Sequence, residues 1–489
     1  MPTQYVDGAW VAGSGGGRRE IVNPADGSVV ATVAEGTSAD THRAIAAARK
    51  SFDAGDWAFG PVQERVAVLN RIADLLAADR AAVARLETLD TGKTLRESED
   101  DVDDVVAVFR YYAGLGDKDG GRVVAAASPT VSSRIVYEPV GVCGLIAPWN
   151  YPLLQVSWKL APALVAGNTV VVKPSEVTPL TTIRLVEMLE QAGVPAGVVN
   201  LVLGSGPVVG APLAESPDVD LVSFTGGLAT GQTLMRAAAG NVKKVALELG
   251  GKNPNIVFAD ADLEAALDNA LTAAFLHSGQ VCSAGARLLV QDEIHDDFVA
   301  ELGRRAERIH LGDGLDPASE SGPLVSSAHR DKVEGYVRLG LAEGARLVAG
   351  GRRPEEADLQ GGFFYRPTVF ADCRRDMRIV QEEVFGPVVT VERFRTEDEA
   401  VALGNDTAYG LAGAVWTSDT GRARRVSGRL RHGTVWVNDY GPYLPQAEWG
   451  GFGRSGIGRE LGPAGLAEYR EAKHIYENTE PAPARWFAG

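Results

Sequence analysis

A chain of 489 residues is too long for one hydrophobic core, so we expect two or more domains. An apolar fraction of 45% and a charged fraction of 23% are those of an ordinary globular protein. The formal net charge of −16 argues against binding to nucleic acids or to anionic membranes.

The first segment of the chain carries short strand and turn signals. It contains a glycine run, Gly13-Ser-Gly-Gly-Gly17, but no helical pattern follows that run directly. A phosphate-binding loop needs such a helix, so we interpret the run as a hairpin or surface turn. The N-terminus lacks a signal-peptide pattern, and no apolar stretch reaches the roughly 18 residues that span a bilayer. We therefore expect a cytoplasmic protein.

Helices are predicted next, followed by an alternation of strands and helices. Apolar residues recur at intervals of three and four from Val62 to Leu76, which indicates a core-facing helical stripe. Beyond residue 140, apolar runs alternate with segments long enough for crossover helices, a pattern typical of a parallel sheet. Such sheets bind ligands at the carboxyl ends of their strands. The predicted strands are Val142–Ile146, Thr169–Val172, Val198–Leu203, Leu221–Phe224, Val245–Leu247, Ala286–Val290, Val388–Phe394, Gly413–Trp416 and Gly433–Val437.

Four segments that follow these strands carry candidate chemical groups. Asn150 could point its amide at a developing oxyanion, although two neighbouring prolines also suit a plain rigid turn. Lys173-Pro-Ser-Glu176 offers a cation and an acid for ribose hydroxyls. Phe224-Thr-Gly-Gly227 is a glycine turn that opens a helix, where free backbone N–H groups can receive a pyrophosphate. Glu248 ends a strand before a Gly-Gly turn and is a candidate base, with a solvated loop carboxylate as the alternative.

The chain has three cysteines, too few for a disulfide framework and suited to a reducing compartment. One of them stands in Gly279-Gln-Val-Cys282. A cysteine alone is more often buried packing than a nucleophile. A thiol near its reference pKa of about 8.5 is only a few per cent thiolate, so a catalytic Cys282 needs a base or a positive field nearby.

Taken together and in this order, these segments resemble the aldehyde dehydrogenase superfamily. The likeness rests on Ile146-Ala-Pro-Trp-Asn150, Lys173-Pro-Ser-Glu176, Phe224-Thr-Gly226, Glu248-Leu-Gly-Gly-Lys252, Gly279-Gln-Val-Cys282 and Glu383-Val-Phe-Gly-Pro387, and runs from Asn23 to Lys473. It implies that Cys282 attacks the aldehyde, that Asn150 holds the oxyanion and that Glu248 activates water for thioester hydrolysis. It further implies a proton relay through Lys159 and Glu471.

The resemblance also implies a dinucleotide cofactor. Glu176 would repel a 2′-phosphate, so NAD is favoured over NADP, which some relatives with this glutamate still use. One position departs from the family pattern, because Gly227 lacks a hydroxyl that would bond the pyrophosphate. The implied cofactor-binding residues are Ile146, Ala147, Pro148, Trp149, Lys173, Ser175, Glu176, Gly206, Phe224, Thr225, Gly226, Gly227, Leu249, Glu383 and Phe385.

The substrate side resembles the betaine aldehyde and aminoaldehyde dehydrogenase branch. Tyr151, Trp158 and Trp449 match an aromatic box of that branch, and the faces of such rings attract a cationic group. The alternative is that these aromatic residues form an ordinary tunnel wall. Leu276 replaces a tryptophan of that branch, and His277 is interpreted as a packing residue. Asp101 and Asp104 match acids at the tunnel entrance, with a solvated acidic face as the alternative. The substrate residues implied by the resemblance are Tyr151, Trp158, Trp449, Asp101, Asp104, Tyr440 and Tyr443.

The predicted activity is therefore NAD-dependent oxidation of a cationic aldehyde, either betaine aldehyde or an ω-aminoaldehyde such as 4-aminobutyraldehyde. The alternatives are a broad-specificity aliphatic or semialdehyde dehydrogenase and a non-catalytic protein on the same fold. A CoA-acylating relative is disfavoured because such enzymes typically lack the general-base glutamate, which is Glu248 here.

The resemblance implies a Rossmann-type α/β fold with a parallel-sheet NAD domain, an α/β catalytic domain and a small β oligomerisation flap. The predicted boundaries are 1–121 and 139–249 for the NAD domain, 250–455 for the catalytic domain, and 122–138 and 456–489 for the flap and tail. Edge strands in the flap need a partner, so we expect a homodimer or a dimer of dimers.

Overall fold

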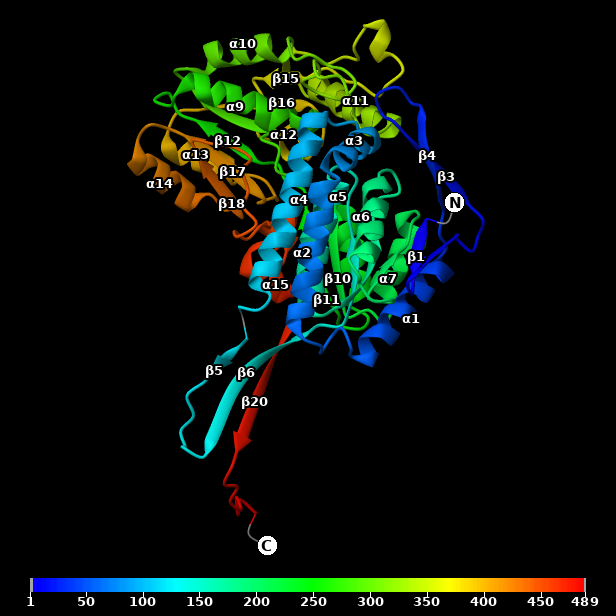
Figure 1. The fold of residues 1–489 in the computed structure, drawn as a ribbon. Coiled ribbons are helices and arrows are strands. Elements are labelled where there is room, and N and C mark those ends of the chain that lie inside the picture. Colours follow the sequence, from blue (N-terminus) through cyan, green and yellow to red (C-terminus); the bar gives the residue numbers. More distant parts are fainter. Residues whose placement is uncertain (1–2, 119, 488–489) are drawn as a thin grey trace.

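The computed structural model describes residues 3–118 and 120–487. It is built around two large sheets covered by helices, with a slender three-stranded sheet extending away from them (Figure 1). Among the described residues, no helix is both long and apolar enough to cross a membrane.

The first large sheet has the strand order β19-β11-β10-β7-β8-β9-β1-β2. Its central strands β11, β10, β7, β8 and β9 are parallel to one another, as their continuous apolar sequences predict. The strands are β1 (Gln4–Val6), β2 (Ala9–Val11), β7 (Val142–Ile146), β8 (Thr169–Lys173), β9 (Val199–Leu201), β10 (Leu221–Gly226), β11 (Lys244–Leu249) and β19 (Gly456–Ile457).

Helices cover the first sheet and form the largest hydrophobic core with it. Helix α2 buries Leu69, Ile72 and Leu76, which confirms the predicted helical stripe. Helix α5 is buried along almost its whole length, because α2 and α4 pack on one side of it and the sheet on the other. The helices of this part are α1 (Ser38–Ala54), α2 (Val62–Ala78), α3 (Arg80–Thr91), α4 (Leu95–Leu115), α5 (Pro152–Ala166), α6 (Leu180–Gln191), α7 (Ala211–Glu215) and α8 (Leu228–Ala238).

The second large sheet has the order β14-β15-β16-β13-β12-β17-β18 and is parallel except for its edge strand β14. Its strands are β12 (Pro254–Val257), β13 (Arg287–Gln291), β14 (Arg346–Ala349), β15 (Thr368–Ala371), β16 (Val388–Phe394), β17 (Ala412–Trp416) and β18 (Thr434–Val437). Its helices are α9 (Leu263–Phe275), α10 (His295–Ala306), α11 (Ser327–Ala342), α12 (Arg378–Gln381), α13 (Glu397–Gly404) and α14 (Thr420–Arg429).

Two small sheets complete the fold. Strands β3 (Arg18–Val22) and β4 (Val29–Ala34) form a hairpin-like pair, and the Gly13–Gly17 run precedes β3 as a turn. Strands β5 (Arg122–Val123), β6 (Val131–Pro139) and β20 (Arg470–Asn478) form the sheet that projects from the body (Figure 1). This sheet lies where the flap and tail are predicted.

One predicted boundary is corrected by β19. Residues 456–457 fall in the segment predicted as flap and tail, yet β19 pairs antiparallel with β11 and belongs to the first large sheet. The short helix α15 (Gly462–Glu468) follows it, and only then does the chain enter β20. The chain comes back to the first large sheet here because β11 would otherwise be an open edge, and a short strand of Gly456 and Ile457 can pair with that edge.

Candidate active site

The carboxyl ends of four neighbouring parallel strands gather the predicted groups at one edge of the first sheet. In the strand register, Ile146 lies beside both Lys173 and Phe224. Thr225 lies beside Glu248 on the next strand along. The segments carrying Asn150, Lys173, Gly226 and Glu248 therefore leave the sheet at the same edge, as expected for a parallel sheet.

Cys282 stands in a strained loop that other segments hold in place. After α9, His277, Ser278 and Gly279 all adopt positive φ angles of 47°, 52° and 68°. The two non-glycine residues are in a conformation that is uncommon for L-amino acids. Gly279 is required here, because a Cβ would lie 2.2 Å from the carbonyl oxygen of Gly386.

Two side chains fix the loop through three of its backbone carbonyl groups. Asn253 donates from Nδ2 to the carbonyl oxygens of Cys282, at 2.9 Å, and Ala284, at 3.0 Å. The Tyr440 hydroxyl donates to the carbonyl of Ser283 at 2.7 Å. The thiol is thus carried by a rigid loop and is itself only partly buried. Burial, with the charges of Glu383 and Glu248, raises the pKa of Cys282 to about 12.

Asn150, which follows strand β7 of the first large sheet, contacts the same loop. Its side chain is buried, and its Nδ2 donates to the carbonyl oxygen of Gln280 at 2.8 Å. An amide nitrogen has two N–H bonds. One of them is used to orient the side chain, which leaves the second for an oxygen bound beside Cys282.

Glu248 is buried at the end of β11, and its Oε2 has no hydrogen-bond partner among the described residues. A Cβ on Gly450 would lie 2.7 Å from Oε1, so the carboxyl group is packed closely against that glycine. Burial, followed by the charge of Glu460, raises the pKa of Glu248 well above its ordinary value. A carboxyl group with a raised pKa can take and hold a proton near neutral pH.

The structure pairs Lys159 with a carboxylate other than the predicted Glu471. Lys159 is fully buried, its Nζ donates to Thr225 Oγ1 at 2.6 Å, and it forms an ion pair with the buried carboxylate of Glu460. Glu471 instead lies on the projecting strand β20, is mostly exposed, and pairs with Lys244 at 3.4 Å. The register of β20 with β6 carries Glu471 away from the site.

This difference predicts different stabilities for two variants. Lys159→Met is expected to lower the free energy of unfolding by about 3–5 kcal/mol, because it leaves the buried Glu460 without its cation. Glu471→Gln removes an exposed carboxylate, and its denaturation midpoint should stay near that of the unmodified protein. Chemical denaturation followed by circular dichroism measures both. Equal losses in the two variants would contradict the assignment of Glu460 as the partner.

A cavity of about 720 Å³ opens between the carboxyl edge of the first sheet and the loop that carries Cys282; we call it the glycine-lined cavity. Eight of the predicted cofactor-binding residues line it: Pro148, Trp149, Thr225, Gly226, Gly227, Leu249, Glu383 and Phe385. Asn150, Glu248 and Cys282 line it as well.

The other predicted cofactor residues lie outside this cavity. Ile146, Ala147 and Phe224 are buried in hydrophobic cores, and the Phe224 ring packs beneath Gly226. Lys173 donates from Nζ to Glu176 at 3.0 Å at the end of β8, and Ser175 caps the following turn. Gly206 begins the short helical turn Gly206–Gly210 after β9. The structure therefore brings together one part of the predicted set, and the remaining polar residues stand along the same sheet edge.

Sequence reasoning missed four residues of the glycine-lined cavity: Gln155, Gly250, His329 and Lys332. His329 and Lys332 are three apart on α11, so they share a face, which was the available signal. His329 donates from Nε2 to the backbone oxygen of Phe385 at 2.7 Å, which fixes the tautomer that carries its proton on Nε2. This contact holds Phe385 at a positive φ of 62°.

Glu383 is held close to the Gly250–Gly251 turn. The backbone N–H of Gly251 donates to Glu383 Oε1 at 3.0 Å, and a Cβ on Gly250 would lie 2.1 Å from the same carboxyl group. Only glycine at position 250 permits this approach. Burial raises the pKa of Glu383 to about 7.

A second cavity, of about 970 Å³, lies on the opposite side of Cys282; we call it the aromatic cavity. All seven predicted substrate residues line it: Tyr151, Trp158, Trp449, Asp101, Asp104, Tyr440 and Tyr443. Tyr151, Gln155 and Cys282 line both cavities, so the two meet at the thiol. Trp158 packs edge-on against Tyr443 and Trp449, with ring centroids 5.1 and 5.9 Å apart.

Two acidic residues of the aromatic cavity, Asp101 and Asp104, are already engaged in hydrogen bonds. Asp101 is buried and accepts from Lys93 Nζ at 2.5 Å, and Asp104 accepts from the Tyr443 hydroxyl at 2.5 Å. Leu276 lines the cavity, and the buried ring of His277 packs edge-on against Tyr151 at 5.5 Å. Burial lowers the pKa of His277 well below its ordinary value, which agrees with a packing role.

Comparisons with known proteins agree with this geometry. Residues 10–475 match the model of the aldehyde dehydrogenase family. The chain is 60% identical to betaine aldehyde dehydrogenase of Bacillus subtilis (strain 168), with 99% of each chain covered. It is 42% identical to aminoaldehyde dehydrogenase 2, peroxisomal, of Pisum sativum, over 100% of this chain and 98% of that one. Betaine aldehyde dehydrogenase of Staphylococcus aureus in complex with NAD+ superposes with a TM-score of 0.99 at 54% identity, over 100% and 97% of the two chains.

Proposed function

The chain belongs to the aldehyde dehydrogenase family, and we propose that its substrate is betaine aldehyde, which it oxidises to glycine betaine. It is an NAD-dependent enzyme that converts an aldehyde to a carboxylate. The observation that carries the choice of substrate is the aromatic cavity, which ends at Cys282 and is lined by Tyr151, Trp158, Tyr443 and Trp449.

Aromatic rings suit a quaternary ammonium group because such a cation has no N–H bond to donate. Its attraction to a ring face is worth about 0.5–2 kcal/mol per ring. The Bacillus and Staphylococcus relatives are betaine aldehyde dehydrogenases, which supports the same choice. An ω-aminoaldehyde is the second candidate, favoured by Asp104 at the cavity wall, since a primary ammonium can donate to a carboxylate.

The residues of the glycine-lined cavity fit a dinucleotide. Helix α8 begins at Leu228, and its N-cap residue Gly227 supplies no side-chain cap, so the first backbone N–H groups of the helix are free to bind a pyrophosphate. Lys173 and Glu176 stand at the end of β8 for ribose hydroxyls, and Glu383 would hold the second ribose. NAD+ bound there supplies the acceptor for the hydride. The Staphylococcus relative was crystallised in complex with NAD+, which supports this fit.

We infer that Cys282 forms a bond from Sγ to the aldehyde carbon, while its proton passes to Glu248. The free N–H of Asn150 and the backbone N–H of Cys282 hold the oxygen that becomes negative. Collapse of this adduct expels hydride and leaves a thioester on Cys282. Because burial keeps the resting thiol protonated, a neighbouring base is needed for this step.

Hydrolysis of the thioester follows after Glu248 has released the thiol proton. Glu248 takes a proton from water, the water oxygen attacks the thioester carbon, and the carbon–sulfur bond breaks to release the carboxylate and the thiol. The proton then leaves through the buried group formed by Lys159, Thr225 and Glu460, which we assign as the relay. This assignment is supported by the influence of both Glu460 and Lys159 on the pKa of Glu248.

We also propose that the chain assembles as a homo-oligomer, a dimer or a dimer of dimers. The projecting sheet has two edges, β5 and β20, and β20 is largely exposed along its nine residues. An unpaired edge of this length is a template for another strand.

The substrate proposal is tested by comparing three aldehydes. Betaine aldehyde should exceed tert-butylacetaldehyde, its uncharged isostere, by about tenfold or more in kcat/KM, because only the cation gains attraction to the ring faces. Initial NADH formation measures this, and 4-aminobutyraldehyde ranks the second candidate. Equal or better turnover of the uncharged aldehyde would contradict the substrate assignment but leave the dehydrogenase in place. No NADH from any of the three would contradict both.

A further inference from the structure

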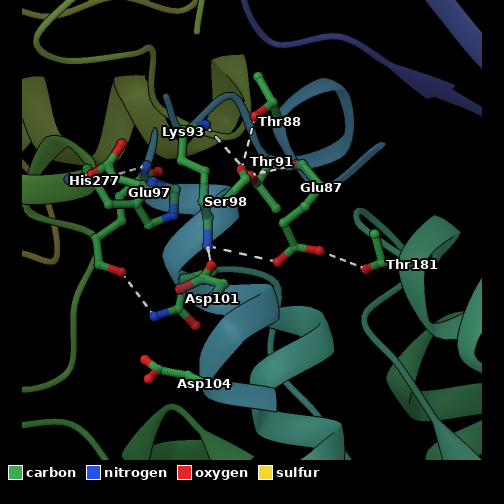
Figure 2. A network of polar contacts seen from close by, with 12 residues as sticks. Glu87, Thr88, Thr91, Lys93, Glu97, Ser98, Asp101, Asp104, Thr181 and His277 are labelled. Atoms are coloured by element: carbon green, nitrogen blue, oxygen red, sulfur yellow. Dashed lines mark hydrogen bonds and ion pairs between the residues drawn. The ribbon is translucent and has the colours of Figure 1, made fainter. Parts of the chain in front are cut away.

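A fully buried lysine lies beside the aromatic cavity. Lys93 stands in the turn between α3 and α4, and none of its side chain is exposed. Its ammonium contacts Asp101 at 2.5 Å and Glu87 at 3.6 Å (Figure 2). Glu87 in turn accepts a hydrogen bond from the hydroxyl of Thr181 at 2.6 Å. A charge buried this completely requires compensating partners, which these carboxyl groups provide.

The same ammonium lies over a wall of the aromatic cavity. Lys93 Nζ is 3.9 Å from the centroid of the Tyr151 ring, a cation–π contact in a desolvated setting. A ring has two faces, so an internal cation already occupies one face of Tyr151. Since Tyr151 also lines the aromatic cavity beside Cys282, a cationic substrate must approach within reach of this positive charge.

Asp101 is the group that compensates the charge most closely. Its carboxyl group borders the aromatic cavity but is bound to Lys93, and the side chain is only 8% exposed. Asp104, one turn further along α4, stands apart from Lys93 (Figure 2). It accepts a hydrogen bond from Tyr443 instead. Lys93 is also the largest influence that opposes the burial-driven rise in the pKa of Asp101.

We propose that Lys93 sets the selectivity of the aromatic cavity between cationic and uncharged aldehydes, and that Asp101 acts on substrate choice by neutralising Lys93. This inference rests on the proposed function. Asp101 is then a positioning residue that keeps a built-in cation from repelling the substrate. At this wall, a cationic substrate meets the charge of Lys93 together with that of Asp101, because the second carboxyl partner of Lys93, Glu87, does not line the cavity.

A single and a double variant of this ion pair are expected to differ in substrate selectivity. In Asp101→Asn, the closest counter-charge of Lys93 is lost, and the ratio of kcat/KM for betaine aldehyde to that for tert-butylacetaldehyde should fall about tenfold through charge repulsion. In Lys93→Met/Asp101→Asn, the cation is absent too, and the ratio should return to within about threefold of the unmodified enzyme. A merely structural role would change the chemistry at Cys282 for both aldehydes alike and would leave this ratio unchanged.

If Asp101 contacted the substrate directly, the double variant would be as unselective as Asp101→Asn, and that result would overturn the proposal. The double variant removes both ends of the closest ion pair. Glu87 loses its cation as well, but burial raises the pKa of Glu87, so it can be held as the neutral acid with the hydrogen bond from Thr181 retained, and the double variant should fold. Lys93→Gln/Asp101→Asn is a second version of it with the same expected ratio. Thermal unfolding and NAD+ affinity confirm that each variant is folded.

Asp103→Asn is the matched control on the same helix. Asp103 is exposed and pairs with Arg80 at 2.7 Å, away from the aromatic cavity, so its ratio should equal that of the unmodified enzyme. The two hypotheses fail separately in this experiment. Absence of turnover in the unmodified enzyme contradicts the proposed function, whereas normal turnover with an unrestored ratio in the double variant contradicts only the role of Lys93.

Discussion

Replacing Cys282 with alanine is expected to lower NADH formation by about 10⁴-fold or more, while NAD+ still binds. Cys282 lies where the glycine-lined and aromatic cavities meet, and no other described cysteine lines either one. Without the sulfur, no covalent adduct can form, and the hydride has no tetrahedral carbon to leave. Steady-state NADH formation and calorimetric titration with NAD+ measure the two properties separately.

Cys143→Ala is the control for this loss. Cys143 is buried in β7 among core residues, so its removal should cost some stability and leave kcat nearly unchanged. Residual activity of Cys282→Ala within a hundredfold of the unmodified enzyme would contradict the covalent mechanism. So would an equally inactive Cys143→Ala.

Glu248→Gln should separate the two halves of the reaction. Thioester formation can still proceed with another proton acceptor, but hydrolysis loses its base, so steady-state turnover is expected to fall about 10²–10⁴-fold. A rapid burst of NADH, close to one per Cys282, should precede the slow phase. Stopped-flow absorbance measures the burst, and mass spectrometry of acid-quenched protein should find the acyl group on Cys282.

Glu468→Gln is the matched control, because Glu468 also raises the pKa of Glu248 but lines neither cavity. Its turnover should stay within about threefold of the unmodified enzyme. A Glu248→Gln variant that loses the burst as well would show that Glu248 is required before the thioester forms. That outcome would contradict the expectation that another group can accept the thiol proton of Cys282 when Glu248 is replaced.

The parallel strands could be predicted because each is a short, continuous apolar run between turns. Strands β7, β10 and β16 begin at the predicted residues. Strand β12 was missed, since its four residues begin only three positions after Gly251 and give no separate signal. Strand β19 was missed for a stronger reason. Its two residues form a strand only because the edge of β11 is available.

The candidate site divides in the same way. Cys282, Glu248 and Asn150 stand in recognisable segments, so their positions could be predicted from the chain alone. The partner of Lys159 could not, because Glu460 is 301 residues away and reaches it only through the fold. Lys93 gave no signal at all. A lysine in a polar turn is normally solvated, and its burial depends on α4 and Tyr151 closing over it.

The position of strand β19 late in the chain also determines when the first large sheet can be completed during synthesis. The wall of the sheet beside Glu248 is completed by residues 456–457, which leave the ribosome only after the whole second sheet has been made. Until then, the nascent chain carries β11 with an unpaired edge, the kind of surface that chaperones shield and other chains can join. A ribosome-bound chain that stops before Gly456 should therefore hold a largely folded first sheet that is still unable to activate water.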